Sequence, residues 1–167
     1  DKDIFVQSGI LAKQTKKDEK ILLEFVSANP TGPLHIGHAR GAIAGDSLAR
    51  VGKYLGYDIT TEYYINDAGA QMDLLGLSVS LAARDFLFKE DVTYPETYYR
   101  GEYLIDIANV VIEKFGKDII YDEARFKEIA FFSKDLVMEI IIKDLKDLGI
   151  TFDNFVSEKS LYSSWDT

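Results

Sequence analysis

Two histidines, His35 and His38, are the residues of this chain whose type and spacing most clearly suggest chemistry. They are its only histidines, and both fall in one His-Ile-Gly-His tetrapeptide that follows a loop at residues 28–34. Residues 21–26 before the loop predict a short buried strand, and residues 39–55 after it predict a helix. Such a junction presents the unpaired N–H groups and positive dipole end of a helix, which together bind anions such as a triphosphate.

Two other roles fit the same pair of histidines. Side chains at i and i+3 share a helix face and can bind zinc, but a closed zinc site usually needs four ligands. The chain has no cysteine and no third histidine, so zinc would need a carboxylate such as Asp46, and we expect no metal site. The histidines could also be ordinary polar residues at a helix start. Gly37 argues against this, because glycine disfavours a helix unless a ligand or another backbone approaches closely.

Composition bounds the class of protein. With 167 residues, 47% hydrophobic and 28% charged, the chain is long enough to bury a core and is typical of a globular domain. The lack of cysteine fits a reducing compartment, and no apolar run approaches the ~20 residues that span a membrane. The formal charge of −9 argues against a broad nucleic-acid surface. We therefore expect a cytoplasmic protein with no membrane partner, whose RNA contacts are local or lie elsewhere.

The chain divides into four predicted segments. Residues 1–20 are expected to be a linker or the tail of an upstream domain. Residues 21–69 predict strand, helix and strand, the βαβ unit that opens a doubly wound nucleotide-binding fold. Residues 70–149 are almost wholly helical, and residues 150–167 return towards the sheet before the chain stops. The lack of an initial methionine and of a closing element suggests a piece of a longer protein.

Hydrophobic periodicity and glycine stops place the individual elements. The predicted strands are at residues 21–26, 58–65 and 150–156, and the predicted helices are at 39–55, 72–88, 99–115 and 122–148. Ligands of such folds bind at the carboxyl ends of the strands. His35, His38 and residues 66–69 all fall at that edge.

Two further features are open to more than one interpretation. Glu24 is a charge within a predicted strand, and it either pairs with a lysine or arginine or faces a cationic substrate. The tyrosines at positions 94, 98, 99 and 103 could stack nucleic-acid bases. We expect ordinary packing instead, because tyrosines at helical spacing usually seat an amphipathic helix.

Residues 24–46 closely resemble the class I aminoacyl-tRNA synthetases, whose ATP-binding loop carries His-Ile-Gly-His at this junction. The run Ala-Asn-Pro-Thr-Gly-Pro-Leu-His-Ile-Gly-His-Ala-Arg-Gly-Ala at 28–42 and the run Tyr-Tyr-Ile-Asn-Asp-Ala-Gly-Ala-Gln at 63–71 resemble the arginyl-tRNA synthetase family specifically. The resemblance implies an α/β fold, the first half of a class I Rossmann-like nucleotide-binding domain, with a largely helical connective insertion at 70–149. The motif region comprises Ala28, Asn29, Pro30, Thr31, Gly32, Pro33, Leu34, His35, Ile36, Gly37 and His38.

The resemblance also implies a reaction. The carboxylate of L-arginine attacks the α-phosphate of ATP, pyrophosphate leaves, and the arginyl-adenylate then esterifies the 3′ end of tRNA(Arg). Charge builds on the phosphates, so fixed donors aimed at them matter most. By resemblance, His35 and His38 are the catalytic donors, and Gly37 and Gly41 complete the ATP-binding residues. Mg²⁺ would accompany ATP, with no residue assigned to it.

Amino-acid recognition is implied in the same way. In the family, the residues that match Glu24, Ser27 and Asn29 line the arginine pocket, with the serine and asparagine near the α-amino group. Three residues at the same strand edge are further candidates for this pocket: Asn66, Asp67 and Gln71.

The chain departs from a complete synthetase in what it lacks. It has no second βαβ half, no Lys-Met-Ser-Lys-Ser-type loop and no anticodon-binding helical domain. We therefore expect tRNA(Arg) to bind mainly through domains missing from this chain, and the chain alone to be inactive. Two alternatives stay open: a small nucleotidyltransferase with a similar His-x-Gly-His helix start, and a synthetase-like protein that has lost catalysis and serves as a binding module.

Overall fold

A computed structural model describes residues 16–162, so most of the expected linker at 1–20 lies outside the described residues. Its centre is a parallel three-stranded sheet in the order β1 (Lys20–Glu24), β2 (Asp58–Ile65), β3 (Asn154–Ser157). Glu24 pairs in register with Glu62, and Ser157 with Ile65. The three strands therefore finish at the same edge of the sheet, as the α/β fold class predicts.

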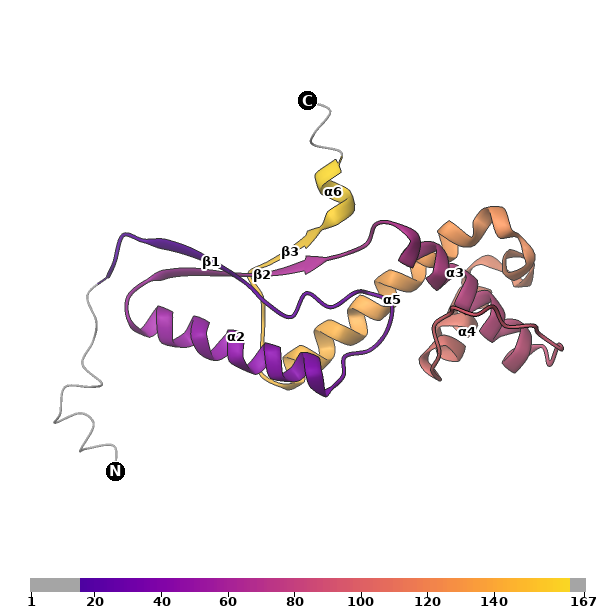
Figure 1. Cartoon of the computed structure of the whole chain (residues 1–167), viewed down its shortest axis with the longest axis horizontal. Helices are drawn as coiled ribbons and strands as arrows, with labels where there is room; N and C mark the ends of the chain where they lie inside the picture. The colour runs from indigo at the N-terminus through magenta and orange to yellow at the C-terminus, as the bar shows by residue number, and fades with distance from the viewer. Residues whose placement is uncertain (1–15, 163–167) are drawn as a thin grey trace.

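Helix α2 (Ile36–Tyr54) is the crossover between β1 and β2, and Figure 1 shows it running back along the sheet from the edge where the strands finish. Two glycines let this helix lie close to the sheet. A Cβ at Gly45 would lie 2.3 Å from Cγ of Phe25, and a Cβ at Gly52 would lie 2.9 Å from Cδ1 of Ile59. The close contact of this helix with the sheet therefore requires glycine at these two positions.

The segment between β2 and β3 is helical. Its main helices are α3 (Ala70–Ala82), α4 (Tyr103–Phe115) and α5 (Phe126–Asp147), and its short elements are a π-helical turn at Ala83–Leu87 and 3₁₀ turns at Lys117–Tyr121 and Glu123–Arg125; a five-residue helix, α6 (Glu158–Tyr162), follows β3. In Figure 1, α3 and α4 lie beyond the edge where the strands finish, and α5 returns the chain to β3. The helical segment therefore stands next to the predicted ligand-binding edge.

Most of the buried core lies among these helices. Leu75 and Val79 of α3, Val111 of α4, and Val137 and Ile141 of α5 have no exposed surface. Helix α3 packs against both of the other two helices, and it contacts α5 so closely that a Cβ at Gly76 would be 2.2 Å from the carbonyl oxygen of Phe126. The helical segment has its own core, which gives the site a rigid neighbour.

The α/β class and the strand at Asp58–Ile65 are confirmed, and other element boundaries need correction. The first strand ends at Glu24 rather than residue 26, because Val26 and Ser27 take left-handed backbone angles, with φ of 67° and 42°. Nor is it a buried strand: within the described residues it is an edge strand, and Leu22 is 58% exposed.

The helix boundaries differ as well. The first helix starts at Ile36 instead of residue 39 because His35 caps it. Helix α4 starts at Tyr103 instead of residue 99, after Gly101 with φ of 144°. The helix predicted at 72–88 ends as α-helix at Ala82 and continues as the π-helical turn. The helix predicted from 122 begins with 3₁₀ turns, and the strand predicted from 150 begins at Asn154.

The contact between Gly45 and Phe25 predicts a stability difference between two glycines of α2. Gly45→Ala forces Phe25 to move, and overpacking of this kind costs ~1–3 kcal/mol, against ~1 kcal/mol gained in helix propensity. Gly41→Ala is the matched control, since a Cβ there would meet no atom within 4 Å. In urea unfolding we expect Gly45→Ala to be less stable than the original protein and Gly41→Ala to be equally or more stable. Equal stabilisation by both substitutions would contradict this packing.

Candidate functional site

The turn after β1 brings two predicted site residues together. Left-handed backbone at Val26 and Ser27 is strained, especially for β-branched valine, and such strain tends to occur at functional sites. The turn directs the Ser27 hydroxyl back to donate a hydrogen bond to the Glu24 carboxylate. The same hydroxyl oxygen accepts the backbone N–H of Tyr64 at 3.0 Å. Glu24 and Ser27 therefore form one unit at the end of the first two strands.

The loop that follows is held from below by β2. The hydroxyl of Tyr63 donates to the carbonyl oxygen of Ala28 at 2.9 Å, and both Tyr63 and Pro30 are fully buried. Burial raises the pKa of Tyr63 to about 12, so the hydroxyl remains a donor throughout the physiological pH range. Asn29 lies between these two anchored positions with its side chain exposed. The loop path thus fixes where Asn29 sits.

The two histidines cap helix α2 reciprocally. The backbone N–H of Gly37 donates to Nδ1 of His35 at 3.1 Å, and the backbone N–H of His35 donates to Nδ1 of His38 at 3.3 Å. Their rings stack with centroids 3.7 Å apart and planes 16° apart. A Cβ at Gly37 would lie 2.9 Å from Cε1 of His35. The glycine therefore makes room for the capping ring, and its role in admitting ATP stays a prediction.

These hydrogen bonds determine what the imidazoles can do. A ring whose Nδ1 accepts a hydrogen bond carries its proton on Nε2 and is neutral. Burial, and next the nearby ring of His35, lower the pKa of His38, which keeps His38 neutral at pH 7. Both rings therefore offer an Nε2–H donor at the positive end of a helix of 19 residues. Donors so arranged suit the phosphate oxygens of a nucleotide.

The strand edge beside this cap is acidic. The pKa of Tyr64 is raised by desolvation and then by the negative charges of Glu158, Asp67 and Glu24. Among residues 16–162, no lysine or arginine forms an ion pair with Glu24. Of the two interpretations of Glu24, pairing with a basic side chain is therefore absent from the described part of the chain. A carboxylate without a basic partner favours a cationic ligand.

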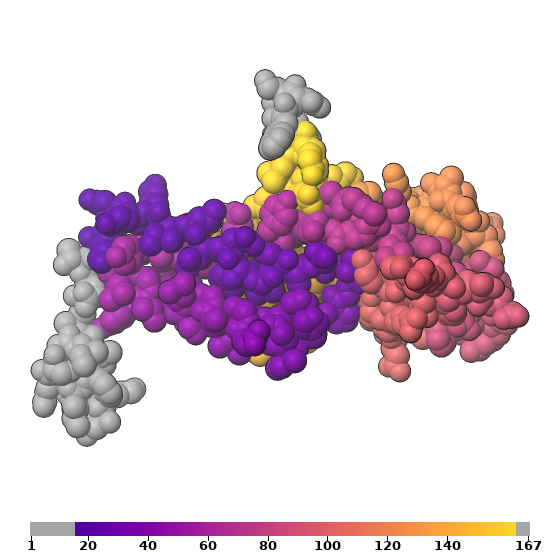
Figure 2. Space-filling view, viewed as in Figure 1, coloured from indigo at the N-terminus to yellow at the C-terminus, as the bar shows by residue number. Residues whose placement is uncertain are grey.

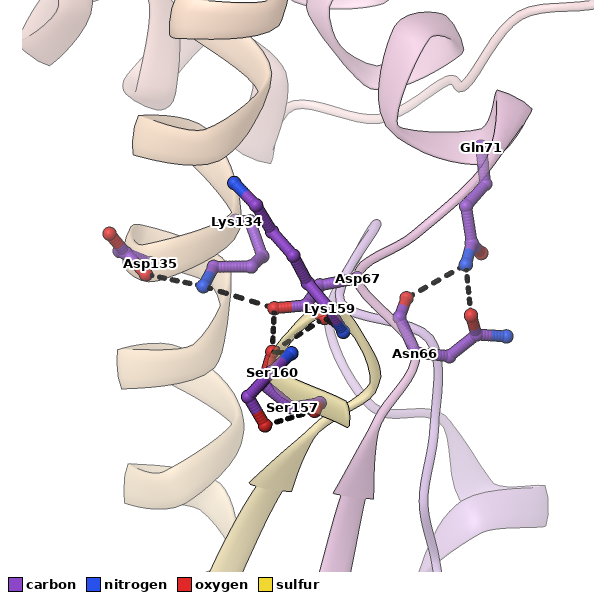
Figure 3. Close-up of polar contacts among 8 residues, drawn as sticks. All are labelled: Asn66, Asp67, Gln71, Lys134, Asp135, Ser157, Lys159 and Ser160. Carbon is purple, nitrogen blue, oxygen red and sulfur yellow. Dashed lines mark hydrogen bonds and ion pairs between the residues drawn. The ribbon is translucent and has the colours of Figure 1, made fainter. Parts of the chain in front are cut away.

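Asp67 has a structural role at this edge of the sheet, where it contacts several other elements (Figure 3). It is 2% exposed, and its carboxylate accepts the Ser157 hydroxyl at 2.8 Å and the Lys159 backbone N–H at 3.0 Å. The ammonium of Lys134 lies 3.6 Å away. Asp67 thus joins the end of β2 to the junction of β3 and α6, with Lys134 of α5 alongside.

Gln71 and Asn66 close the adjoining turn (Figure 3). The side-chain amide of Gln71 donates to the backbone carbonyl and to the side-chain oxygen of Asn66, both at 2.7 Å. These contacts and those of Asp67 are internal to the protein. Their assignment to an arginine pocket stays a prediction, as do the ligand roles of Glu24, Ser27 and Asn29.

The sequence does not reveal every residue that supports the site. The alternation over residues 58–65 predicts a strand without showing that Tyr63 supports the loop.

Tyr94, Tyr98 and Tyr99 precede α4 instead of lying on it, and they line a pocket of about 630 Å³ with exposed Phe86. The expected helical placement of these three is therefore wrong, because α4 begins only at Tyr103, whereas Tyr99 and Tyr103 do pack against the core as expected.

Two kinds of feature are absent from the described part of the chain. Residues 16–162 contain no cluster of three or more histidine, aspartate or glutamate side chains arranged to hold a metal ion. Over the same range, no helix has both the length and the apolar character needed to cross a membrane.

Comparison with known proteins relates this chain to a known family. Residues 2–162 match a family model described as the catalytic domain of class I tRNA synthetases (R). An arginine–tRNA ligase of Aliarcobacter butzleri is 81% identical over 155 residues, which is 93% of this chain and 29% of that protein. An arginine–tRNA ligase of Campylobacter concisus is 61% identical over 161 residues, which is 96% of this chain and 31% of that protein.

Solved structures agree with this relationship. A structure described as an arginyl-tRNA synthetase from Campylobacter jejuni superposes with a TM-score of 0.86 at 47% identity, covering 96% of this chain and 36% of that chain. Thermus thermophilus arginyl-tRNA synthetase superposes with a TM-score of 0.57 at 19% identity, covering 95% of this chain and 27% of that chain, a likeness in fold. The present chain thus spans about three-tenths of the length of the curated relatives above.

The histidine cap predicts the titration of His38. Its lowered pKa means that the folded protein favours the neutral ring. The stability that depends on this ring is therefore present above its ordinary pKa of 6.5 and is lost as the pH falls through the lower folded value. In an imidazole NMR titration we expect a His38 midpoint below 6.5, and His35→Gln should raise it by removing the neighbouring imidazole, which contributes to the lowered pKa of His38. A midpoint at or above the ordinary value in the unmodified protein would contradict the geometry.

Proposed function

Because the chain belongs to the family of class I arginyl-tRNA synthetase catalytic domains, we propose that it forms the ATP- and arginine-binding part of an arginine–tRNA ligase. The proposed reaction joins L-arginine to ATP as arginyl-adenylate with release of pyrophosphate, and then transfers arginine to the 3′ end of tRNA(Arg). The observation that carries this proposal is the stacked pair of histidines with reciprocal hydrogen bonds at the start of α2. A tRNA-charging activity also implies a cytoplasmic location, where translation takes place.

The proposed role of the histidines follows from charge. When the arginine carboxylate attacks the α-phosphate, negative charge increases on the phosphate oxygens, and preorganised donors stabilise it. The Nε2–H groups of His35 and His38 are such donors, because their Nδ1 atoms are already occupied by backbone N–H groups. We propose that these rings bind the phosphates of ATP. The surface at Gly41, where an added Cβ would meet no atom within 4 Å, is proposed to receive the nucleoside.

The proposed arginine site is the acidic strand edge. Arginine is a dication before its carboxylate is counted, with a guanidinium and an α-ammonium group that both need acceptors. Glu24 presents a carboxylate with no basic partner in residues 16–162, and Ser27 fixes its position. Exposed Asn29 adds an amide oxygen on the same loop. We propose that these three residues hold the amino acid.

We propose that magnesium arrives as part of the MgATP substrate. The described residues offer no cluster of acidic or histidine side chains for a metal ion of the protein's own. The phosphates of ATP are therefore proposed to carry the ion, and no step of the reaction is assigned to it.

Recognition of tRNA(Arg) is proposed to lie mainly outside this chain. The chain carries a formal charge of −9, which disfavours extended contact with phosphates. It also spans only 29% and 31% of the two ligases compared above. The proposed interaction with tRNA is therefore assigned to the parts of the protein beyond this sequence.

Pyrophosphate exchange tests the proposal on the full-length protein that carries this sequence. We expect ATP–pyrophosphate exchange that depends on L-arginine and on no other proteinogenic amino acid, with tRNA(Arg) present. Citrulline is the matched control, because it has nearly the shape of arginine and no positive side-chain charge, so the acidic edge should reject it. Exchange with another amino acid would retain the chemistry and overturn the arginine assignment. Absence of exchange with every amino acid would favour a protein that has lost catalysis.

Two substitutions at His38 separate the cap from the phosphate contact. In His38→Asn, the side-chain oxygen replaces Nδ1 as the acceptor for the His35 N–H, while the Nε2–H donor is lost. We expect adenylate formation to fall by about 10²–10³ with little change in melting temperature, as for loss of one preorganised donor. His38→Gln places an amide N–H near the Nε2 position and should retain more activity. An asparagine variant within about threefold of the original rate would remove His38 from the reaction.

A further inference from the structure

One residue of the helical segment reaches into the loop that carries the proposed site. The hydroxyl of Tyr103, in the first turn of α4, donates a hydrogen bond to the backbone carbonyl oxygen of Thr31 at 2.6 Å. The next residue of the loop, Gly32, is so close that a Cβ there would lie 3.2 Å from the Tyr103 oxygen. Figure 2 shows the surfaces of the two segments in contact. Two residues that are 72 positions apart in the sequence are thus in contact at the site.

Three anchors hold this loop, and each acts on a different part of it. Tyr63 binds the carbonyl of Ala28 at 2.9 Å from within the sheet. His35 is fixed at the other end by the cap of α2. Tyr103 binds between them, at Thr31, and it is the anchor that comes from the helical segment. Three residues, Gly32, Pro33 and Leu34, join Thr31 to His35, so the position of Thr31 limits where the capping ring can lie.

The bond from Tyr103 is constant over the pH range of an assay. Burial, and next the neighbouring Tyr99, raise the pKa of Tyr103 to about 12. The hydroxyl therefore keeps its proton and remains a donor wherever the enzyme is assayed. Its ring is partly buried and packs against the core, so Tyr103→Phe can keep the ring in place while the hydroxyl is removed.

We propose that Tyr103 is a positioning residue for the nucleotide, whose hydroxyl fixes Thr31 and thereby aims His35 at the phosphates of ATP. The helical segment is then a supporting wall of the ATP site as well as an insertion between strands. This inference rests on the proposed function of the histidines. It assigns a task to a side chain that lies outside both family-like runs at residues 28–42 and 63–71.

The test is Tyr103→Phe in the full-length protein, assayed by arginine-dependent pyrophosphate exchange. Loss of a single neutral hydrogen bond corresponds to about two- to tenfold in binding, and we expect the KM for ATP to rise by that factor. The KM for arginine should change less than twofold, because Glu24 and Ser27 are held by other contacts and Tyr63 anchors the loop at Ala28, next to Asn29. Gly32→Ala, which crowds the same hydroxyl, should reproduce the ATP defect. A general loss of folded protein would instead lower the apparent kcat and leave both KM values unchanged.

Tyr94→Phe is the matched control. Tyr94 lies in the same helical segment and has a pKa raised to about 12. Its hydroxyl donates at 2.5 Å to Asp85, within that segment, instead of to the loop. The substitution should therefore leave both KM values unchanged. An unchanged KM for ATP in Tyr103→Phe, in a protein that exchanges pyrophosphate with arginine, would overturn the inference.

A second measurement separates this inference from the proposed function. If the unmodified protein shows no exchange, the proposed function fails, and the NMR signals of the two imidazoles then decide the positioning role. Tyr103→Phe should shift the His35 signals, whereas Tyr94→Phe should not. Imidazole signals that are identical in all three proteins would overturn the inference.

Discussion

The reciprocal hydrogen bonds, in which the backbone N–H of Gly37 donates to His35 and the backbone N–H of His35 donates to His38, are the interaction on which the rest of the site depends. These hydrogen bonds mark the end of the loop and the start of the helix, and they also fix the orientation of both rings. Since each Nδ1 accepts a hydrogen bond, each ring is left with one outward donor at Nε2. A cap that would ordinarily be a serine or aspartate is thus made from groups that can also stabilise developing phosphate charge.

This cap works only if the preceding loop arrives in the right place, and the loop is costly to form. Left-handed backbone at Val26 and Ser27 stores ~1–3 kcal/mol at each residue, which the surroundings must offset. Phe25, the residue before this turn, packs against Phe152, with ring centroids 4.5 Å apart. Gly45 leaves the space for that ring. The strain and its compensation together place Glu24 and the histidine pair at one edge of the sheet.

The parts of this arrangement that depend on local pattern can be predicted from the sequence. Alternation defines β2, and periodicity with small residues defines most of α2. The predicted end of the first strand is two residues too late because periodicity does not reveal left-handed angles at Val26 and Ser27. The start of α2 is predicted three residues late because histidine is an uncommon cap. Contacts that span the chain, such as Tyr103 with Thr31, depend on the tertiary fold and have no local pattern.

The tautomers of the two histidines test the central claim most directly. In the ¹⁵N imidazole NMR spectrum near pH 7.5, the structure predicts that both rings carry their proton on Nε2 and have a bare, hydrogen-bonded Nδ1. Addition of ATP and arginine to the full-length protein should then shift the Nε2–H resonances most. A proton on Nδ1 of either ring would contradict the account, because that ring could not cap α2 and its outward nitrogen would be an acceptor that repels phosphate.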